Sequence, residues 1–205
     1  MATEGEAGVA AIVLAAGRGT RFAAGSDAIK VLAEVAGEAM VRRVARAALE
    51  SRARPVVVVV GYEATRVREA LSGCPVAVVT NPNHATGLAS SLHAGLGALP
   101  ASARGAIILL GDMPFVSADL LNRLVSVFAD NPDCDAVTPV HDGRRGNPVL
   151  LSRSLFAAVE TLHGDEGARR LLSRSNRVLE IPVEDRAVAI DIDTRDILDV
   201  ETRRF

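Results

Sequence analysis

Residues 10–22, AAIVLAAGRGTRF, join a continuous apolar run to a loop with two glycines and two arginines. A run of Ala, Ile, Val and Leu without polar alternation is typical of a strand buried on both faces of a parallel sheet. Glycines directly after such a strand allow a tight turn whose backbone N–H groups can face an anion. The stretch therefore predicts an α/β fold whose first loop binds a phosphate-bearing ligand.

The same strand pattern returns three times, and helical patterns follow each strand. Further buried strands are expected at residues 55–61, 75–80 and 105–112, and helices at 37–54, 63–71, 88–99 and 118–128. Strands that alternate with helices imply right-handed crossovers. We therefore expect a Rossmann-like, mostly parallel, doubly wound sheet.

After residue 130 the pattern changes from βα units to two strands joined by a short turn. The strands are expected at residues 134–140 and 147–151, and they predict a small antiparallel excursion that covers one side of a site. Helices over residues 152–162 and 165–172 follow, with strands over 177–183 and 188–193.

The composition is that of an ordinary globular protein. The chain has 205 residues, of which 49% are hydrophobic, and a formal net charge of -2. We expect a disordered tail over residues 1–8 and one domain over residues 9–205. The small net charge and the 3% of aromatic residues argue against a nucleic-acid partner. The two cysteines form no CxxC pair, and no apolar run is long enough for a membrane span, so we expect a cytoplasmic protein.

The first loop lacks two common phosphate-binding motifs but is rich in cations. Gly17 and Gly19 supply two glycines of a GxGxxG dinucleotide motif whose third glycine is missing, and no Walker motif is present. The second strand ends in Gly61 and Tyr62 and not in the acidic residue that would bind a ribose. Free backbone N–H groups together with Arg18, Arg21 and Lys30 suit a triphosphate.

Carboxylates near two predicted strand ends suggest a metal site. Asp112 is the last residue of the stretch at 105–112, directly after its apolar run, and Asp191 and Asp193 stand two residues apart, on one face of the expected strand at 188–193. Packing Asp112 against one of these would bring two anions together unless a cation lay between them. Magnesium, which prefers carboxylate and phosphate oxygens, fits this arrangement.

Residues 81–92, NPNHATGLASSL, place polar groups between a strand and a helix. The helix N-terminus can bind an anion. Gly-x-Ser-x-Gly is absent, so a serine hydrolase is not expected. His84, His93, His141 and His163 have no zinc-ligand spacing, and we assign none of them to a metal.

Six segments in order resemble motifs of the MobA-like nucleotidyltransferases, which have a GT-A-like Rossmann-type fold. They are LAAGRGTRF with a later lysine, NPNHATGLASSL, GDMPFV, GNPVLL, GDEGARRLL and DIDT. Within that superfamily the chain is most similar to the molybdenum cofactor cytidylyltransferases, and the resemblance covers nearly the whole chain. It implies transfer of a nucleoside monophosphate from a triphosphate to an acceptor.

The resemblance also implies roles for individual residues. Catalysis would depend on Arg21, Lys30 and Asp112, with Mg²⁺ held by Asp112 and Asp193. The nucleotide would contact Leu14, Ala15, Ala16, Gly17, Gly19, Thr20, Arg21, Lys30, Asn81, Gly87, Ser90 and Asp112. The acceptor would contact Ser91, Asn147, Pro148, Gly164, Asp165, Gly167 and Arg169.

The implied reaction is magnesium-dependent transfer of CMP from CTP, or of a nucleotide from another triphosphate, to a molybdopterin-like phosphate acceptor. The AAG form of the first motif favours cytosine, and a molybdoenzyme or its chaperone is the implied protein partner. Two departures are Lys30, which stands several residues later than in the family, and Arg195-Asp196, where Pro-Glu is usual.

Three alternatives remain open at this point. They are guanylyl or other nucleotidyl transfer to a different phosphorylated acceptor, an NAD(P)H-dependent oxidoreductase of the nicotine-blue type, and a non-catalytic protein that binds or delivers the cofactor.

Overall fold

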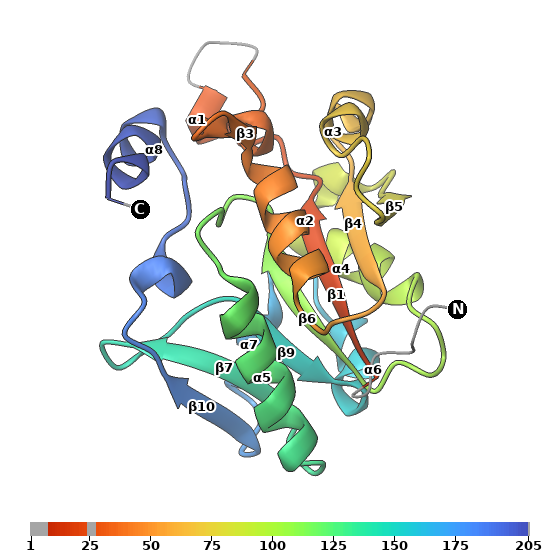
Figure 1. Cartoon of the computed structure of the whole chain (residues 1–205). Coiled ribbons are helices and arrows are strands. Elements are labelled where there is room, and N and C mark those ends of the chain that lie inside the picture. Colours follow the sequence, from red (N-terminus) through yellow and green to blue (C-terminus); the bar gives the residue numbers. More distant parts are fainter. Residues whose placement is uncertain (1–7, 24–27, 205) are drawn as a thin grey trace.

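The computed structural model describes residues 8–23 and 28–204, built around one central sheet (Figure 1). The strand order is β10-β7-β9-β6-β1-β4-β5, with β8 paired to β7. The strands are β1 (Val9–Ala15), β4 (Val56–Val60), β5 (Ala77–Thr80), β6 (Gly105–Leu110), β7 (Ala136–His141), β8 (Arg144–Arg145), β9 (Val149–Ser152) and β10 (Val178–Pro182). A separate hairpin joins β2 (Glu34–Val35) to β3 (Glu38–Ala39).

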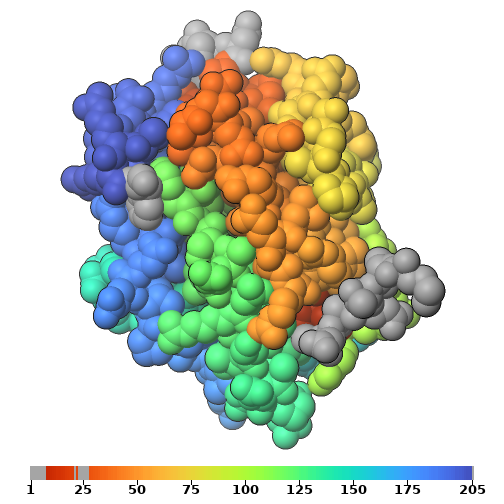
Figure 2. Space-filling view, in the orientation of Figure 1, coloured from red at the N-terminus to blue at the C-terminus, as the bar shows by residue number. Residues whose placement is uncertain are grey.

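Helices cover both faces of this sheet. They are α1 (Thr20–Ala23), α2 (Met40–Glu50), α3 (Ala64–Ala70), α4 (Leu88–Gly97), α5 (Ala118–Asp130), α6 (Phe156–Val159), α7 (Ala168–Leu172) and α8 (Arg195–Thr202). Short 3-10 turns are η1 (Lys30–Leu32), η2 (His84–Thr86), η3 (Arg153–Leu155) and η4 (Arg186–Ala189). Figure 2 shows α2 and α5 side by side on the near face. None of the helices within the described ranges is long and apolar enough to cross a bilayer.

The central strand β1 explains why its sequence is apolar without alternation. Ala11 and Val13 belong to the core cluster that also contains buried residues of α2 and α5. Ile12 and Leu14 belong to the cluster under α4, on the other face. Gly95 lets α4 approach closely, because a Cβ there would lie 2.6 Å from Cγ2 of Ile12. Both faces of β1 are therefore buried, as its sequence predicts.

The strand pairing confirms the predicted fold class. β1 pairs in parallel with β4 and with β6, and β4 pairs in parallel with β5. β9 is antiparallel to both β6 and β7, which is the expected excursion. The chain runs from β1 outward through β4 and β5, then returns to β6 on the other side of β1. In such sheets the ligand lies at this switch, beyond the carboxyl ends of the strands.

The prediction of a strand over residues 188–193 is wrong. Residues 186–189 form η4, and the chain then crosses the carboxyl end of the sheet instead of running along a strand. The backbone N–H groups that would form a ladder are used elsewhere: Ile192 N donates to Asp112 O over 3.0 Å. Ile192 is fully buried, and this anchors the segment beside the loop after β6. Asp191 and Asp193 therefore flank a buried isoleucine in an irregular segment.

Several element boundaries also differ from the sequence prediction. The helix expected from residue 37 begins at Met40, because the preceding residues form the β2–β3 hairpin. The helix expected over 152–162 is η3 followed by α6, which ends at Val159, and the helix expected from 165 begins at Ala168. Residues 1–7 of the expected tail lie outside the described residues, while Gly8 accepts a hydrogen bond from Arg104 N.

Candidate active site

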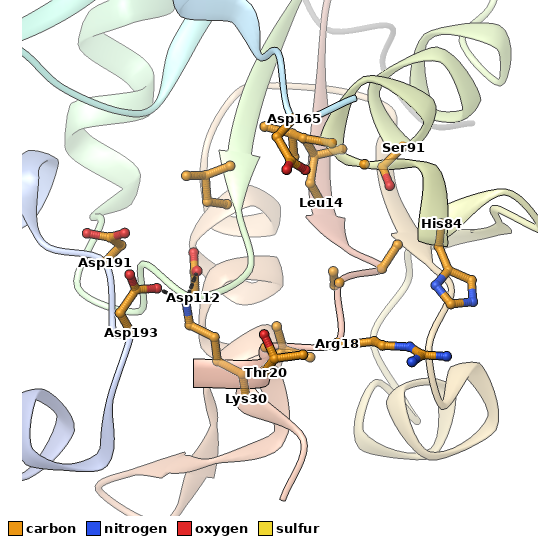
Figure 3. A pocket seen from close by; sticks show the side chains of 18 of the residues that line it. Leu14, Arg18, Thr20, Lys30, His84, Ser91, Asp112, Asp165, Asp191 and Asp193 are labelled. Atoms are coloured by element: carbon orange, nitrogen blue, oxygen red, sulfur yellow. Dashed lines mark hydrogen bonds and ion pairs between the residues drawn. The ribbon is translucent and has the colours of Figure 1, made fainter. Parts of the chain in front are cut away.

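A cavity of 560 Å³ opens at the carboxyl ends of β1 and β6. Gly111 N donates to Leu14 O over 2.9 Å, so the loops that follow these two strands lie side by side. Figure 3 shows the side chains that face this space. The cavity is lined by Leu14, Ala15, Ala16, Gly17, Arg18, Gly19, Thr20, Lys30, Val31, His84, Ala85, Gly87, Leu88, Ser91, Leu110, Asp112, Asp165, Asp191 and Asp193.

The loop after β1 depends on a glycine that packs against Lys30. Gly19 has φ +61°, and a Cβ on it would lie 2.4 Å from Cβ of Lys30. Both the backbone conformation and the contact therefore require glycine at this position. The backbone of Arg21 continues into α1, but its side chain lies outside the described part of the structure.

Lys30 lies between the two carboxylates that were predicted to hold the metal. Its Nζ is 2.5 Å from Oδ2 of Asp112 and 2.5 Å from Oδ1 of Asp193. Burial disfavours the ammonium, but the two carboxylates outweigh burial and raise the pKa of Lys30 above its ordinary value. The sequence predicts a cation between these two carboxylates, and in this structure the cation is the ammonium of Lys30 (Figure 3).

Asp112 keeps one carboxylate oxygen available. Its Oδ1 is buried and has no hydrogen-bond partner among the described residues. A buried carboxylate oxygen without a donor is costly, and it is a suitable ligand for a hard divalent cation. The described residues contain no group of three or more acidic, His or Cys side chains arranged to hold a metal. A divalent cation here would take two carboxylates from the chain and its other ligands from phosphate oxygens and water. This is the usual coordination of magnesium in proteins.

Arg18 and His84 line the opposite wall of the cavity, and Tyr62 lies beside both of them but outside the lining. The Arg18 guanidinium lies 5.2 Å from the centre of the Tyr62 ring, whose centroid is 6.4 Å from that of His84. Gly61 makes room for this arrangement, because a Cβ there would lie 2.5 Å from Cβ of His84. Nδ1 of His84 is buried and has no partner within the described ranges.

The sequence missed this wall in part. The sequence indicates Arg18 as a cation of the first loop but does not predict that it or His84 lines the site. Tyr62 is two residues beyond the end of β4, and the rule that ligands lie beyond the carboxyl ends of strands is the signal that points to this loop.

Asn81 organises the start of α4 from behind the cavity wall. It is 2% exposed, and its Nδ2 donates to Oγ of Ser90 over 2.8 Å and to Oγ of Ser91 over 3.1 Å. Ser91 lines the cavity, whereas Asn81 and Ser90 do not. Asn81 and Ser90 therefore lie behind the residues that line the cavity, and their contact with a nucleotide stays a prediction.

The segment predicted to bind the acceptor is docked on the start of α4. Gly87 has φ +109°, and a Cβ there would lie 2.3 Å from the carbonyl carbon and oxygen of Gly164. Ala89 N donates to Gly164 O over 3.0 Å. Asp165, next in the chain, lines the cavity. The remaining predicted acceptor residues lie outside the cavity lining: Asn147, Pro148, Gly164, Gly167 and Arg169.

Comparisons with known proteins agree with this geometry. Bifunctional protein GlmU of Kineococcus radiotolerans is 37% identical over 131 residues, which are 63% of this chain and 26% of that protein, so the chain spans about a quarter of that relative's length. The structure of an Rv0371c homologue from Mycobacterium sp. strain JC1 superposes with TM-score 0.83 at 23% identity, covering 97% of this chain and 96% of that one. Rv0371c of Mycobacterium tuberculosis in complex with manganese gives TM-score 0.77 at 27% identity, covering 96% and 99%.

The profile of one family spans both the first loop and the carboxylate that faces it. The MobA-like NTP transferase domain matches residues 11–178, which is most of the chain and includes Lys30, Asp112 and most of β1. The chain therefore belongs to the MobA-like NTP transferase family.

Proposed function

We propose that this protein is a nucleotidyltransferase that moves CMP from CTP to a molybdopterin-type phosphate acceptor and releases pyrophosphate. The observation that carries the proposal is the Lys30–Asp112–Asp193 cluster beside a glycine-rich loop at the switch between β1 and β6. Membership of the NTP transferase family supports a nucleoside triphosphate as the first substrate. The manganese complex of a relative supports a divalent metal, and Mg²⁺ is our choice for it.

The proposed reaction is an in-line displacement at the α-phosphorus. An oxygen of the acceptor phosphate forms a bond to this phosphorus, the bridging bond to the β-phosphate breaks, and its electron pair leaves with pyrophosphate. Backbone N–H groups from Ala16 to Thr20, with Lys30 and Arg21, would bind the phosphates and neutralise the negative charge that develops on them. Asp112 and Asp193 would hold Mg²⁺, which supplies further charge neutralisation and fixes the phosphate geometry.

The finer parts of the proposal rest on the motifs and on the lining of the cavity. The Ala15-Ala16-Gly17 step supports cytosine as the base. Ser91 and Asp165 face the same cavity as the first loop, and this supports an acceptor site there. Asn147, Pro148, Gly164, Gly167 and Arg169 would form its outer part. A molybdoenzyme or its chaperone would receive the product.

The test is a substrate panel with two independent measurements. Pyrophosphate release is followed with molybdopterin and each of CTP, GTP, ATP and UTP, with Mg²⁺ or Mn²⁺ and with chelator. Thermal unfolding is measured with the same nucleotides and with NADH and NADPH, because a ligand of the native state raises the unfolding midpoint. We expect metal-dependent release with CTP above the other triphosphates. A stabilising shift with NADPH and none with any triphosphate would reject the proposal.

A further inference from the structure

We infer that Lys30 is a placeholder cation that keeps the metal site closed until a triphosphate arrives, so that metal and nucleotide bind together. The inference rests on the proposed function, because it assigns the two carboxylates to a divalent cation. It adds to that function a positioning role for Lys30 in the empty enzyme, separate from its contact with phosphate.

The first support is the bridging position of the ammonium. Nζ of Lys30 lies 2.5 Å from one oxygen of Asp112 and 2.5 Å from one oxygen of Asp193. A Mg²⁺ ion binds oxygen at about 2.0–2.1 Å, so it would compete with the ammonium for the same two oxygens. The two cations also repel each other strongly at such separations in a partly buried site. A metal ion that binds these two oxygens must therefore displace Lys30.

The second support is that the closed site still has an open ligand position. Oδ1 of Asp112 is buried and has no partner among the described residues, so Lys30 satisfies only part of this carboxylate. A metal bound to a triphosphate brings phosphate oxygens as further ligands. The phosphates also offer Lys30 a new anionic partner, so that every charge remains paired after the exchange.

The third support is the contact between Lys30 and the phosphate loop. The aliphatic part of Lys30 lies against Gly19, at a distance that leaves no room for a Cβ. A small cavity of 170 Å³ adjoins Gly19, Thr20, Phe22, Lys30 and Asp193, and it gives the ammonium space to move. The position of Lys30 and the conformation of the first loop are therefore coupled through the contact at Gly19.

The experiment is a titration of the full chain with Mn²⁺ in the absence of nucleotide, followed by the electron paramagnetic resonance signal of free Mn²⁺. Wild type is compared with Lys30→Met, which keeps the length of the side chain and removes its charge. Arg18→Met is the matched control, because Arg18 lines the same cavity but is drawn on the wall away from the carboxylates (Figure 3). We expect Lys30→Met to bind Mn²⁺ at least about tenfold more tightly than wild type, and Arg18→Met to differ by less than about twofold.

Equal Mn²⁺ affinity of wild type and Lys30→Met would overturn the inference, and so would an equal gain in Arg18→Met. Lys30→Gln repeats the test if the methionine variant does not fold. Wild type provides a further test without any variant. If CTP does not tighten the binding of Mn²⁺, metal and nucleotide do not bind together, which contradicts the inference. If Lys30→Met gains Mn²⁺ affinity but wild type neither binds CTP nor releases pyrophosphate from it, the proposed function fails while the competition between Lys30 and metal stands. If wild type turns over CTP with metal but Lys30→Met shows no gain in Mn²⁺ affinity, the inference about Lys30 fails while the proposed function stands.

Discussion

Asp112 and Asp135 are two carboxylates at opposite ends of neighbouring parts of the sheet, and their surroundings differ sharply. Asp135 precedes β7 at its amino end, and both of its oxygens are satisfied. Oδ1 accepts from Arg177 over 2.6 Å and from Ser154 over 3.2 Å, while Oδ2 accepts from Ser175 over 2.6 Å and from the Arg177 Nε over 3.3 Å. Asp112, at the carboxyl end of β6, shares one oxygen with Lys30 and leaves the other without a partner in the described chain.

The difference separates a carboxylate that stabilises the fold from one that is prepared for a ligand. Asp135 lies in a complete network, and the Ser175 hydroxyl together with Arg177 outweighs burial and lowers its pKa. Asp112 lies in an incomplete network that faces a cavity. Removing Asp135 should therefore cost stability, whereas removing Asp112 should cost activity. The predictions below test this division, beginning with the largest expected effect.

Asp112→Asn should lower nucleotidyl transfer by about 10³-fold, because it removes the charge that faces the proposed metal and the phosphates. The free energy of unfolding should change by less than about 1 kcal/mol, because Lys30 keeps Asp193 as an ion-pair partner and the amide oxygen of asparagine can still accept from Lys30. Steady-state pyrophosphate release and urea unfolding measure the two quantities. Asp142→Asn is the control, because Asp142 is exposed in a turn between β7 and β8 and its side chain is 89% accessible.

Full turnover by Asp112→Asn would remove Asp112 from the catalytic machinery. A large loss of stability would instead assign Asp112 a structural role like that of Asp135.

Asp135→Asn should lower the free energy of unfolding by about 2 kcal/mol, because Arg177 and two hydroxyls lose a charged acceptor in a buried network. The variant should bind CTP and Mn²⁺ like wild type once folded. Urea unfolding measures the stability, and Asp133→Asn, an exposed neighbour, is the control. An unchanged unfolding midpoint would show that the network contributes nothing.

The Asp135→Asn variant also tests how the stabilisation by Asp135 depends on pH. The pKa of Asp135 is lowered in the native state, so the unfolded state binds more protons as the pH falls. The stabilisation is therefore complete above the unfolded value of about 3.9 and is lost as the pH falls through the lower native value. The stability difference between wild type and Asp135→Asn should shrink below about pH 4. A difference that grows as the pH falls would contradict the assigned direction.

The sequence predicted the fold and the first loop well, because both depend on local pattern. Unbroken apolar runs mark strands buried on two faces, and the order of strand and helix then determines the sheet. Ligands are expected beyond the carboxyl ends of parallel strands, and this predicts that the loop after β1 lies beside Asp112. The hydrogen bond from Gly111 N to Leu14 O confirms that the two loops are neighbours. The roles assigned to individual side chains in this loop remain predictions.

The rest depended on contacts between residues far apart in the chain. The charges of Asp112 and Asp193 predict a cation between them, but only the contacts in the structure identify that cation as Lys30. The apolar alternation around Ile192 predicted a strand, yet the backbone N–H of Ile192 donates to Asp112 O, in the loop after β6, and not to a strand. The network of Asp135 joins residues 40 and 42 positions apart, and no local spacing marks it.

The two hydroxyls that bind Asp135 give the finest test of the comparison. Ser175 donates to Oδ2 over 2.6 Å and is the largest cause of the lowered pKa of Asp135, while Ser154 donates to Oδ1 over 3.2 Å. Ser175→Ala should therefore lower the free energy of unfolding by about 1 kcal/mol, and Ser154→Ala by less than about 0.5 kcal/mol. Urea unfolding of both variants measures the order of the effects. The reverse order would mean that contact length does not rank the members of this network, and neither variant should alter CTP turnover, because both serines act on the carboxylate that lies away from the cavity.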